Sequence, residues 1–428
     1  MNVRYPMWLQ TAQQRPGASV FATLYAVESH ARALLATVIT VQALHLLGNA
    51  RDVSLLFSAV GMTGLVASFS IPVLIRYLSR RRVYTLGILL VLCASLALAT
   101  VSIPGQVIGM LFRVYGTACL NIALSLYILQ YIRRSELTVS EPRRMQYGAI
   151  AWVIGPALGV YLYQHFSTLA PFALSACMSL ILMMVFWMLR LSDRPGIVAP
   201  AERSRRGPAR SIGRFFSQPR LRLAWSIVFA RSSWWVFFFI YMPVYAIQQG
   251  LGEVVGAVVV SAGNGLLFLA PIAGGLARRY GVRRVLSVGF FICGTFTFAA
   301  GILFDSPVAV ITLLLLATIG TVMMDAVGNV PFLASVRPRE REEMTTVFRT
   351  YLDASDLIPP ALFALVLSFF DLRVVFLIQG CVTLAFIALL AYLPQRLGKS
   401  RIRIGPEGPL PGAAAAPAIA VMPETESL

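Results

Sequence analysis

The 428-residue chain is 58% hydrophobic and 13% charged, with a mean hydropathy of +0.75, which is more apolar surface than a soluble core of this length can bury. Apolar stretches of about twenty residues match the hydrocarbon thickness of a bilayer and predict a polytopic, all-α membrane protein. The net charge of +18 is the excess of 35 arginines and one lysine over 18 acidic residues, and the basic residues lie mainly between these stretches. No soluble domain remains to bind nucleic acid, so a nucleic-acid partner is not expected.

Twelve transmembrane helices are predicted. In chain order their approximate ranges are 18–47, 53–75, 83–103, 105–132, 146–164, 168–190, 222–247, 254–277, 284–304, 307–335, 345–370 and 373–394. The first seventeen residues have no apolar segment with a cleavage site, so no cleaved signal peptide is expected. All five cysteines fall inside apolar stretches without ligand spacing, so they are interpreted as buried apolar residues and no metal site is expected.

The arginine distribution predicts the orientation. Loops after the second, fourth, sixth, eighth and tenth helices are basic, whereas the opposite loops carry only Arg51 and Arg373. By the positive-inside rule, the basic loops and both termini are cytoplasmic, in the inner (plasma) membrane of the cell. The predicted segments are a cytoplasmic N-terminus 1–17, a six-helix bundle 18–190, a cytoplasmic linker 191–221, a second six-helix bundle 222–394 and a disordered cytoplasmic tail 395–428.

The two halves of the chain repeat each other. Three pairs of segments match at offsets of 202 to 204 residues: PVLIRYLSRRRV (72–83) with GGLARRYGVRRV (274–285), GPALG (155–159) with PPALF (359–363), and AVES (26–29) with FARS (229–232). A duplication of six plus six helices is typical of secondary transporters, which bind their solute between the halves near the membrane midplane.

Together these features resemble the major facilitator superfamily over residues 18–394. The resemblance implies twelve helices in two pseudo-symmetric six-helix bundles that rock about a central solute site. The loops after the second and eighth helices are similar to the family's G-x-x-x-D-R-x-G-R-R motif, which implies a gating role for the matching residues. These are Arg80 and Arg81 in the first loop, and Gly274, Arg279, Gly281 and Arg283 in the second.

Both loops lack the family's aspartate, whose positions hold Arg76 and Arg278. In the family that acid helps to latch the cytoplasmic gate. We hypothesise that loop glutamates replace it, or that they are only solvated loop charges. The glutamates concerned are Glu136, Glu141, Glu340, Glu342 and Glu343.

Further gating residues are expected in the fifth and eleventh helices. Gly155, Pro156 and Gly159 resemble the end of the family's antiporter motif, which implies a gating helix and, more weakly, export. Pro359 and Pro360 occupy the matching place in the second half, where prolines bend a helix.

Nine ionisable side chains fall inside predicted membrane helices: Glu28, His30, Arg32, Arg113, Arg231, Asp325, Arg349, Asp353 and Asp356. A charge at the bilayer centre costs at least about 3 kcal/mol, so these groups must be paired or hydrated. The i, i+4 spacing predicts one pair between Glu28 and Arg32 and another between Arg349 and Asp353.

Asp356 has no basic residue within its own helical turn, so it most needs a partner or a proton. A carboxylate that alternates between apolar surroundings and a neighbouring arginine takes up and releases a proton. The proton-coupling candidates are therefore Asp356 and Glu28 first, followed by Asp325 and Asp353. The AVES/FARS match suggests in addition that Glu28 pairs with Arg231 across the halves.

Substrate-binding candidates are the polar and aromatic residues expected along the central path. They are Arg32, Arg113, Arg231, His30, Asn264, Asn329, Trp234, Trp235 and Tyr241. Alternative roles remain open, because aromatic residues also face lipid, asparagines also join helices, and a histidine is often only hydrogen-bonded within the protein.

No catalytic constellation or nucleotide-binding loop is present in the sequence, so an enzyme or an ATP-driven pump is not expected. The hypothesis is a monomeric secondary transporter without a cofactor, driven by the proton gradient and contacting lipid and a small organic solute. Export by proton antiport is preferred. Uptake of an organic anion by proton symport, or a non-transporting sensor or lipid flippase with the same fold, are the alternatives.

Overall fold

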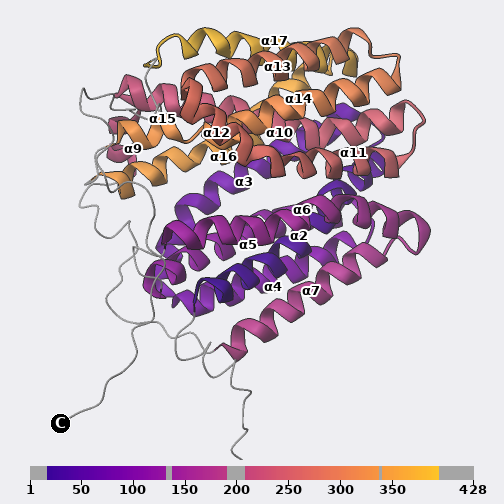
Figure 1. Ribbon diagram of the computed structural model, residues 1–428. Helices are drawn as coiled ribbons and strands as arrows, with labels where there is room; N and C mark the ends of the chain where they lie inside the picture. Colours follow the sequence, from indigo (N-terminus) through magenta and orange to yellow (C-terminus); the bar gives the residue numbers. More distant parts are fainter. Residues whose placement is uncertain (1–16, 132–136, 190–207, 337–339, 395–428) are drawn as a thin grey trace, which may run out of the picture.

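The computed structural model describes residues 17–131, 137–189, 208–336 and 340–394, and within these ranges the protein is helical without strands. Figure 1 shows the long helices lying side by side. The helices of the first half are α2 (Ala18–Leu47), α3 (Ala50–Tyr77), α4 (Arg80–Leu98), α5 (Ile103–Tyr131), α6 (Leu137–His165) and α7 (Ala170–Met188). Those that follow are α9 (Pro208–Phe216), α10 (Pro219–Gln248), α11 (Glu253–Gly265), the 3-10 turn η1 (Leu266–Leu269), α12 (Ala270–Tyr280), α13 (Val282–Ile302), α14 (Pro307–Val327), α15 (Val330–Ser335), α16 (Arg341–Val366) and α17 (Leu372–Leu390).

The all-helical membrane fold is confirmed. Helices cover every predicted span, and ten of the helical stretches are long and apolar enough to cross a bilayer. The helices α6 and α16 span 29 and 26 residues but are not among these ten. Helix starts at 18, 50, 80, 103, 137 and 170 recur at 219, 253, 282, 307, 341 and 372, in agreement with the repeat read from the sequence.

Two predicted spans are broken, which the sequence analysis did not anticipate. The eighth span is divided into α11, η1 and α12, and the tenth into α14 and α15. Pro271 and Pro331 lie in the first turn of the helices that restart, where the missing N–H of proline is tolerated. Helix α16, by contrast, remains helical through Pro359 and Pro360.

The connections between helices separate into two ends of the molecule. We call the end that holds the turns 78–79 and 281 the arginine-rich end, and the end that holds the turns 48–49, 99–102, 166–169, 249–252, 303–306 and 367–371 the arginine-poor end.

Two helix pairs make the most extensive contacts between the halves: α3 packs along α16, and α6 packs along α11. Gly61 permits the first contact, because a Cβ atom there would lie 2.6 Å from the backbone oxygen of Asp356. Ser58 and Ser68 of α3 add hydrogen bonds to the Leu357 carbonyl and the Asp353 carboxylate, at 3.3 Å and 2.7 Å. The backbones of α3 and α16 are therefore in direct contact near the middle of both helices.

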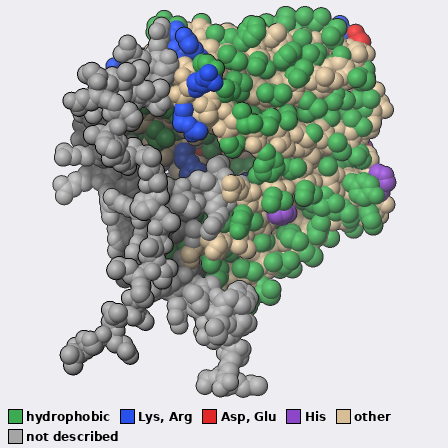
Figure 2. Space-filling view, viewed as in Figure 1, with side chains coloured by type: hydrophobic (Ala, Val, Ile, Leu, Met, Phe, Trp, Pro, Cys, Tyr) green, Lys and Arg blue, Asp and Glu red, His purple; other side chains and the backbone are tan. Residues whose placement is uncertain are grey.

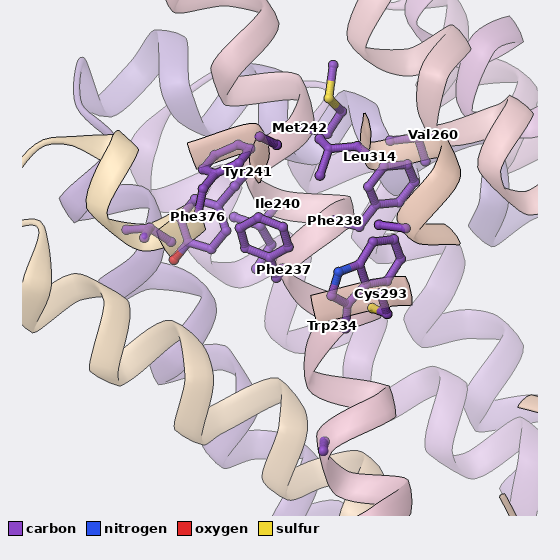
Figure 3. Packing of buried hydrophobic residues seen from close by; sticks show 14 of the residues in the cluster. Trp234, Phe237, Phe238, Ile240, Tyr241, Met242, Val260, Cys293, Leu314 and Phe376 are labelled. Atoms are coloured by element: carbon purple, nitrogen blue, oxygen red, sulfur yellow. The ribbon is translucent and has the colours of Figure 1, made fainter. Parts of the chain in front are cut away.

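The core of the second half is aromatic (Figure 3). Trp234 stacks on Phe238 with ring centroids 5.1 Å apart, and its indole nitrogen donates to the Thr297 hydroxyl at 2.8 Å. Because the polar atom is satisfied, the whole side chain is buried without an unpaired donor.

Helix α9, in the predicted linker, packs on the arginine-rich end of the second half. Its Phe215 is completely buried in a cluster with Phe332 and Phe348. Arg214 of α9 pairs with Glu340 at 2.5 Å. The hypothesis that Glu340 pairs with the arginines of the gating loops is therefore wrong for this conformation, because the nearer cation comes from the linker. Glu136 and the side chains of Glu141, Glu342 and Glu343 lie outside the described residues.

The halves are closed against each other at the arginine-poor end. All residues from Thr37 to Leu44 of α2 and from Ile240 to Ala246 of α10 are buried, which requires neighbours on every side of both helices. Two polar contacts cross the interface there, between the Tyr241 and Ser54 hydroxyls at 2.7 Å and between His45 Nε2 and Glu253 Oε1 at 2.6 Å. Near the arginine-rich end the surface is hollowed between the halves, with basic side chains around the hollow (Figure 2).

Candidate functional site

The candidate site is a group of charged and aromatic side chains between the halves, midway along α2, α5, α6, α10 and α16 and in the last turn of α14. In the first half, Arg32 Nε lies 2.9 Å from a carboxylate oxygen of Glu28, so the predicted i, i+4 pair is confirmed. The Arg32 guanidinium also lies over the Trp152 ring, 5.8 Å from its centroid. Arg113 of α5 donates to the Arg32 carbonyl at 3.1 Å and thereby joins this group.

The second half holds its own ion pair. Arg231 of α10 lies 2.9 Å from the Asp325 carboxylate of α14 and donates to the Tyr351 hydroxyl at 3.1 Å. Trp235, one turn along α10, donates to the other Asp325 oxygen at 2.8 Å. The hypothesis of a Glu28–Arg231 pair across the halves is wrong for this conformation, because each residue has an oppositely charged partner within its own half.

Asp356 and Asp353 lie on α16 where it crosses α3. Asp353 accepts a hydrogen bond from Ser68 instead of pairing with Arg349, whose side chain is exposed and has no ion pair within the described residues. The predicted direct Arg349–Asp353 ion pair is not formed, although the two charges still interact, because packing of α3 places a hydroxyl closer to the carboxylate than the helical neighbour.

The Asp356 side chain is exposed, although it lies midway along a helix that packs across the interface. Its charge interacts with that of Arg113, which belongs to the other half. Among the described residues Asp356 forms no ion pair within 4.0 Å, so the two charges interact without direct contact. The sequence-based expectation that Asp356 lacks a partner on its own helix agrees with this arrangement.

Among the predicted aromatic residues, only Trp235 belongs to the charged group. Trp234 and Tyr241 are completely buried, in the core and in the closed interface respectively, so neither faces an open path in this conformation. The structure instead brings forward Trp152 of α6 and Phe239 of α10, whose rings meet edge to face across the halves at 5.6 Å. The repeat offset of 204 pairs Trp152 with Asp356, a signal that the sequence analysis did not use.

The neutral polar candidates are satisfied locally or lie at a helix break. His30 Nδ1 lies 2.8 Å from the Ala26 carbonyl, and Asn264 donates to the Val260 carbonyl at 2.9 Å, both one turn back along their own helices. Asn329 is exposed between α14 and α15. Their roles in substrate binding remain predictions.

The predicted gating glycines have clear packing roles. A Cβ atom at Gly159 would lie 1.8 Å from the Leu34 carbonyl oxygen, and one at Gly155 would lie 2.6 Å from Ala33 Cβ, so both glycines let α6 contact α2. Pro156 lies between them within α6. Gly281 has φ +95° in the turn between α12 and α13, a conformation that favours glycine, whereas a Cβ atom at Gly274 would meet nothing within 4 Å.

The arginines of the gating loops make local contacts. Arg81 lies over the Trp187 ring at 4.0 Å, Arg279 over the Tyr280 ring at 5.3 Å, and Arg283 donates to the Leu393 carbonyl at 3.3 Å. Arg80 begins α4 and is buried. The side chain of Arg76 lies outside the described residues, so the gating role of both loops remains a prediction.

Comparison with known proteins identifies the fold. The family model of the major facilitator superfamily matches residues 21–268 and 253–420. No curated protein matches the chain by sequence. Solved structures that resemble the chain include a variant of the nucleoside transporter NupG, with a TM-score of 0.69 and 14% identity over 87% of this chain and 99% of that chain. A variant of the peptide transporter POT has a TM-score of 0.71 and 13% identity over 90% of this chain and 95% of that chain.

A variant of the E. coli fucose:proton symporter FucP is also similar, at TM-score 0.59 and 13% identity over 88% of this chain and 98% of that chain. Identities this low show a shared fold and not a shared substrate. The match of the family model across both halves goes further, because it covers most of the chain. The protein is a multi-pass membrane protein that belongs to the major facilitator superfamily, and it is a transporter rather than an enzyme.

Proposed function

We propose that this protein is a proton-coupled secondary transporter that exports a small organic solute in exchange for protons. The observation that carries the proposal is the position of Asp356, an exposed carboxylate midway along α16 whose charge interacts with that of Arg113 in the other half. The other acids of the site are already engaged, Glu28 with Arg32, Asp325 with Arg231 and Asp353 with Ser68.

Alternating access gives this arrangement a chemical consequence. The Glu28–Arg32 and Arg231–Asp325 pairs each lie within one half, so they move as units when the halves rock. Arg113 and Asp356 belong to different halves, so the distance between their charges changes. A carboxylate that loses a nearby cation in apolar surroundings takes up a proton, and one that regains the cation releases it.

The proposed orientation places the arginine-rich end and both termini in the cytoplasm of the cell, following the positive-inside rule. The hollow near that end then faces the cytoplasm, and the protein, acting as a monomer in the inner membrane, loads its solute there. The solved neighbours include a fucose:proton symporter, so proton coupling occurs on this fold.

Proton symport of an organic anion is the second candidate. The observation that favours it is the closeness of two cations, since the Arg113 and Arg32 charges interact and Arg113 donates to the Arg32 backbone. A pair of adjacent guanidinium groups suits a carboxylate or phosphate.

The test is proton movement in liposomes that contain the purified protein and a trapped pH-sensitive dye. Phenethylamine, L-phenylalanine and 3-phenylpropionate are added in turn as a cationic, a zwitterionic and an anionic probe. We expect at least one probe to drive proton movement, with Asp356→Asn abolishing it and Arg349→Gln, on the same helix, preserving it. Proton movement opposite to the probe supports antiport, and movement with the probe supports symport. Coupled movement that persists in Asp356→Asn contradicts the assignment of the carboxylate.

A further inference from the structure

The charges of the site divide into those that are matched and those that are open. Glu28 with Arg32, and Asp325 with Arg231, are ion pairs at 2.9 Å, so each adds no net charge to the cavity. Arg113 and Asp356 are a further cation and anion that interact across the two halves, and the Asp353 carboxylate, one turn away from Asp356, accepts a hydrogen bond from Ser68.

Neither member of this open pair is fully satisfied by the described residues. Arg113 uses one guanidinium nitrogen on the Arg32 carbonyl, and its Nε is buried without a hydrogen-bond partner there. Asp356 is exposed and has neither a hydrogen bond nor an ion pair within the described ranges. The two groups therefore offer a donor from one half and an acceptor from the other.

Aromatic rings from both halves lie next to Arg32. Trp152 of the first half and Phe239 of the second meet edge to face, and Phe239 lies 6.0 Å from Trp235. The Arg113 side chain donates to the Arg32 carbonyl, and the Arg32 guanidinium lies over the Trp152 ring. Arg32 therefore contacts both the open pair and the rings. A flat apolar group stacks well on such rings.

We infer that the site binds a zwitterionic solute with an apolar or aromatic part, whose anionic group binds Arg113 and whose ammonium group binds Asp356. This inference rests on the proposed function, because it names the solute class of the same cavity. A zwitterion compensates both members of the open pair at once. A simple anion leaves the Asp356 charge without a partner, and a simple cation leaves Arg113 without one, and unpaired charges in a site surrounded by protein are unfavourable.

The same arrangement accounts for the exchange of the solute for a proton. The ammonium group of the solute and a proton compete for one carboxylate, so Asp356 carries either the solute or the proton. Mutual exclusion at a shared acid yields antiport, provided that the empty protein crosses only when Asp356 is protonated.

The test is binding to the purified full-length protein without a pH gradient, measured as a ligand-dependent rise in melting temperature. L-Phenylalanine is compared with its methyl ester, which lacks the anion, and with 3-phenylpropionate, which lacks the cation. We expect the zwitterion to bind roughly tenfold or more tightly than either analogue, since each lost contact is a hydrogen bond to a charged group.

Two variants test which residue binds the anionic group of the solute and which binds its ammonium group. Arg113→Gln removes the preference for the zwitterion over the methyl ester, and Asp356→Asn removes the preference over 3-phenylpropionate. Arg349→Gln, which changes an exposed charge on the same helix, leaves both preferences unchanged. Equal binding of the three probes, binding of the anion alone, or no binding of any probe overturns the inference.

Failure of this inference and failure of the proposed function are distinguishable. The binding preference is measured without proton movement, so a zwitterion site without coupled transport refutes only the proton-coupled function. Coupled transport of 3-phenylpropionate with no preference for phenylalanine refutes only the zwitterion site.

Discussion

Replacing Tyr241 by phenylalanine is predicted to loosen the closed interface at the arginine-poor end. The Tyr241 hydroxyl is completely buried and meets the Ser54 hydroxyl of α3 at 2.7 Å, so this contact exists only while the halves are closed there. Ser54 keeps a second hydrogen bond to the Ala50 carbonyl at 2.7 Å after the substitution. No buried donor is left unpaired, and the loss is the net contribution of one hydrogen bond, about 1 kcal/mol.

A loss of about 1 kcal/mol corresponds to roughly a fivefold shift in the ratio of open to closed molecules. Tyr245→Phe is the matched control, since that buried hydroxyl donates to the Phe304 carbonyl at 2.8 Å within the second half. This variant removes a bond of the same kind and is expected to lower thermal stability. It should not alter the balance between the conformations, because its bond does not cross the interface.

The assay is pulsed electron paramagnetic resonance between spin labels at Phe166 and Phe369 in a cysteine-free background. These side chains are 71% and 76% exposed, in turns of opposite halves at the arginine-poor end. Tyr241→Phe should increase the population with long distances, whereas Tyr245→Phe should not. An unchanged distance distribution in Tyr241→Phe, or the same change in both variants, refutes the view that this hydroxyl pair helps to hold the halves together.

The His45–Glu253 contact also crosses this interface and is an ion pair when the imidazole is protonated, so at such a pH salt distinguishes it from the hydroxyl pair. His45 is 48% exposed, so the pair contributes about 0.2–1 kcal/mol and is screened at high ionic strength. In the same assay, His45→Ala should therefore open the interface at low salt and resemble the unmodified protein at high salt. Tyr241→Phe should show the same shift at both ionic strengths, and a salt dependence there would contradict a neutral hydrogen bond.

Gly61→Ala should cost about 1–3 kcal/mol in stability, because its Cβ would lie 2.6 Å from the α16 backbone. Gly274→Ala, with no atom within 4 Å of its Cβ, should keep the melting temperature of the unmodified protein. Equal effects of the two glycine substitutions would contradict the close contact between α3 and α16. Asp325→Asn should lower stability by about 3–5 kcal/mol by leaving Arg231 charged and unpaired, whereas Arg231→Met combined with Asp325→Leu should restore most of the melting temperature. A double variant as unstable as the single one would show that the pair does not act as a unit.

The sequence by itself determined the class of fold, the positions of the helices and the repeat. Apolar length and loop charge act locally along the chain, so the first predicted helix and α2 share the range 18–47. It also identified the membrane charges, and helical spacing alone predicted the Glu28–Arg32 pair, because residues four apart face each other on any helix.

Tertiary structure decided which charges are matched and which are open. The same spacing failed at Arg349 and Asp353, because Ser68 arrives from another helix, and only packing between α10 and α14 gives Arg231 its partner Asp325. The contact of Gly61 with the α16 backbone likewise depends on two segments about 300 residues apart in the chain. Local periodicity specifies the face of a helix, but the neighbour on that face is set by how all the helices pack together.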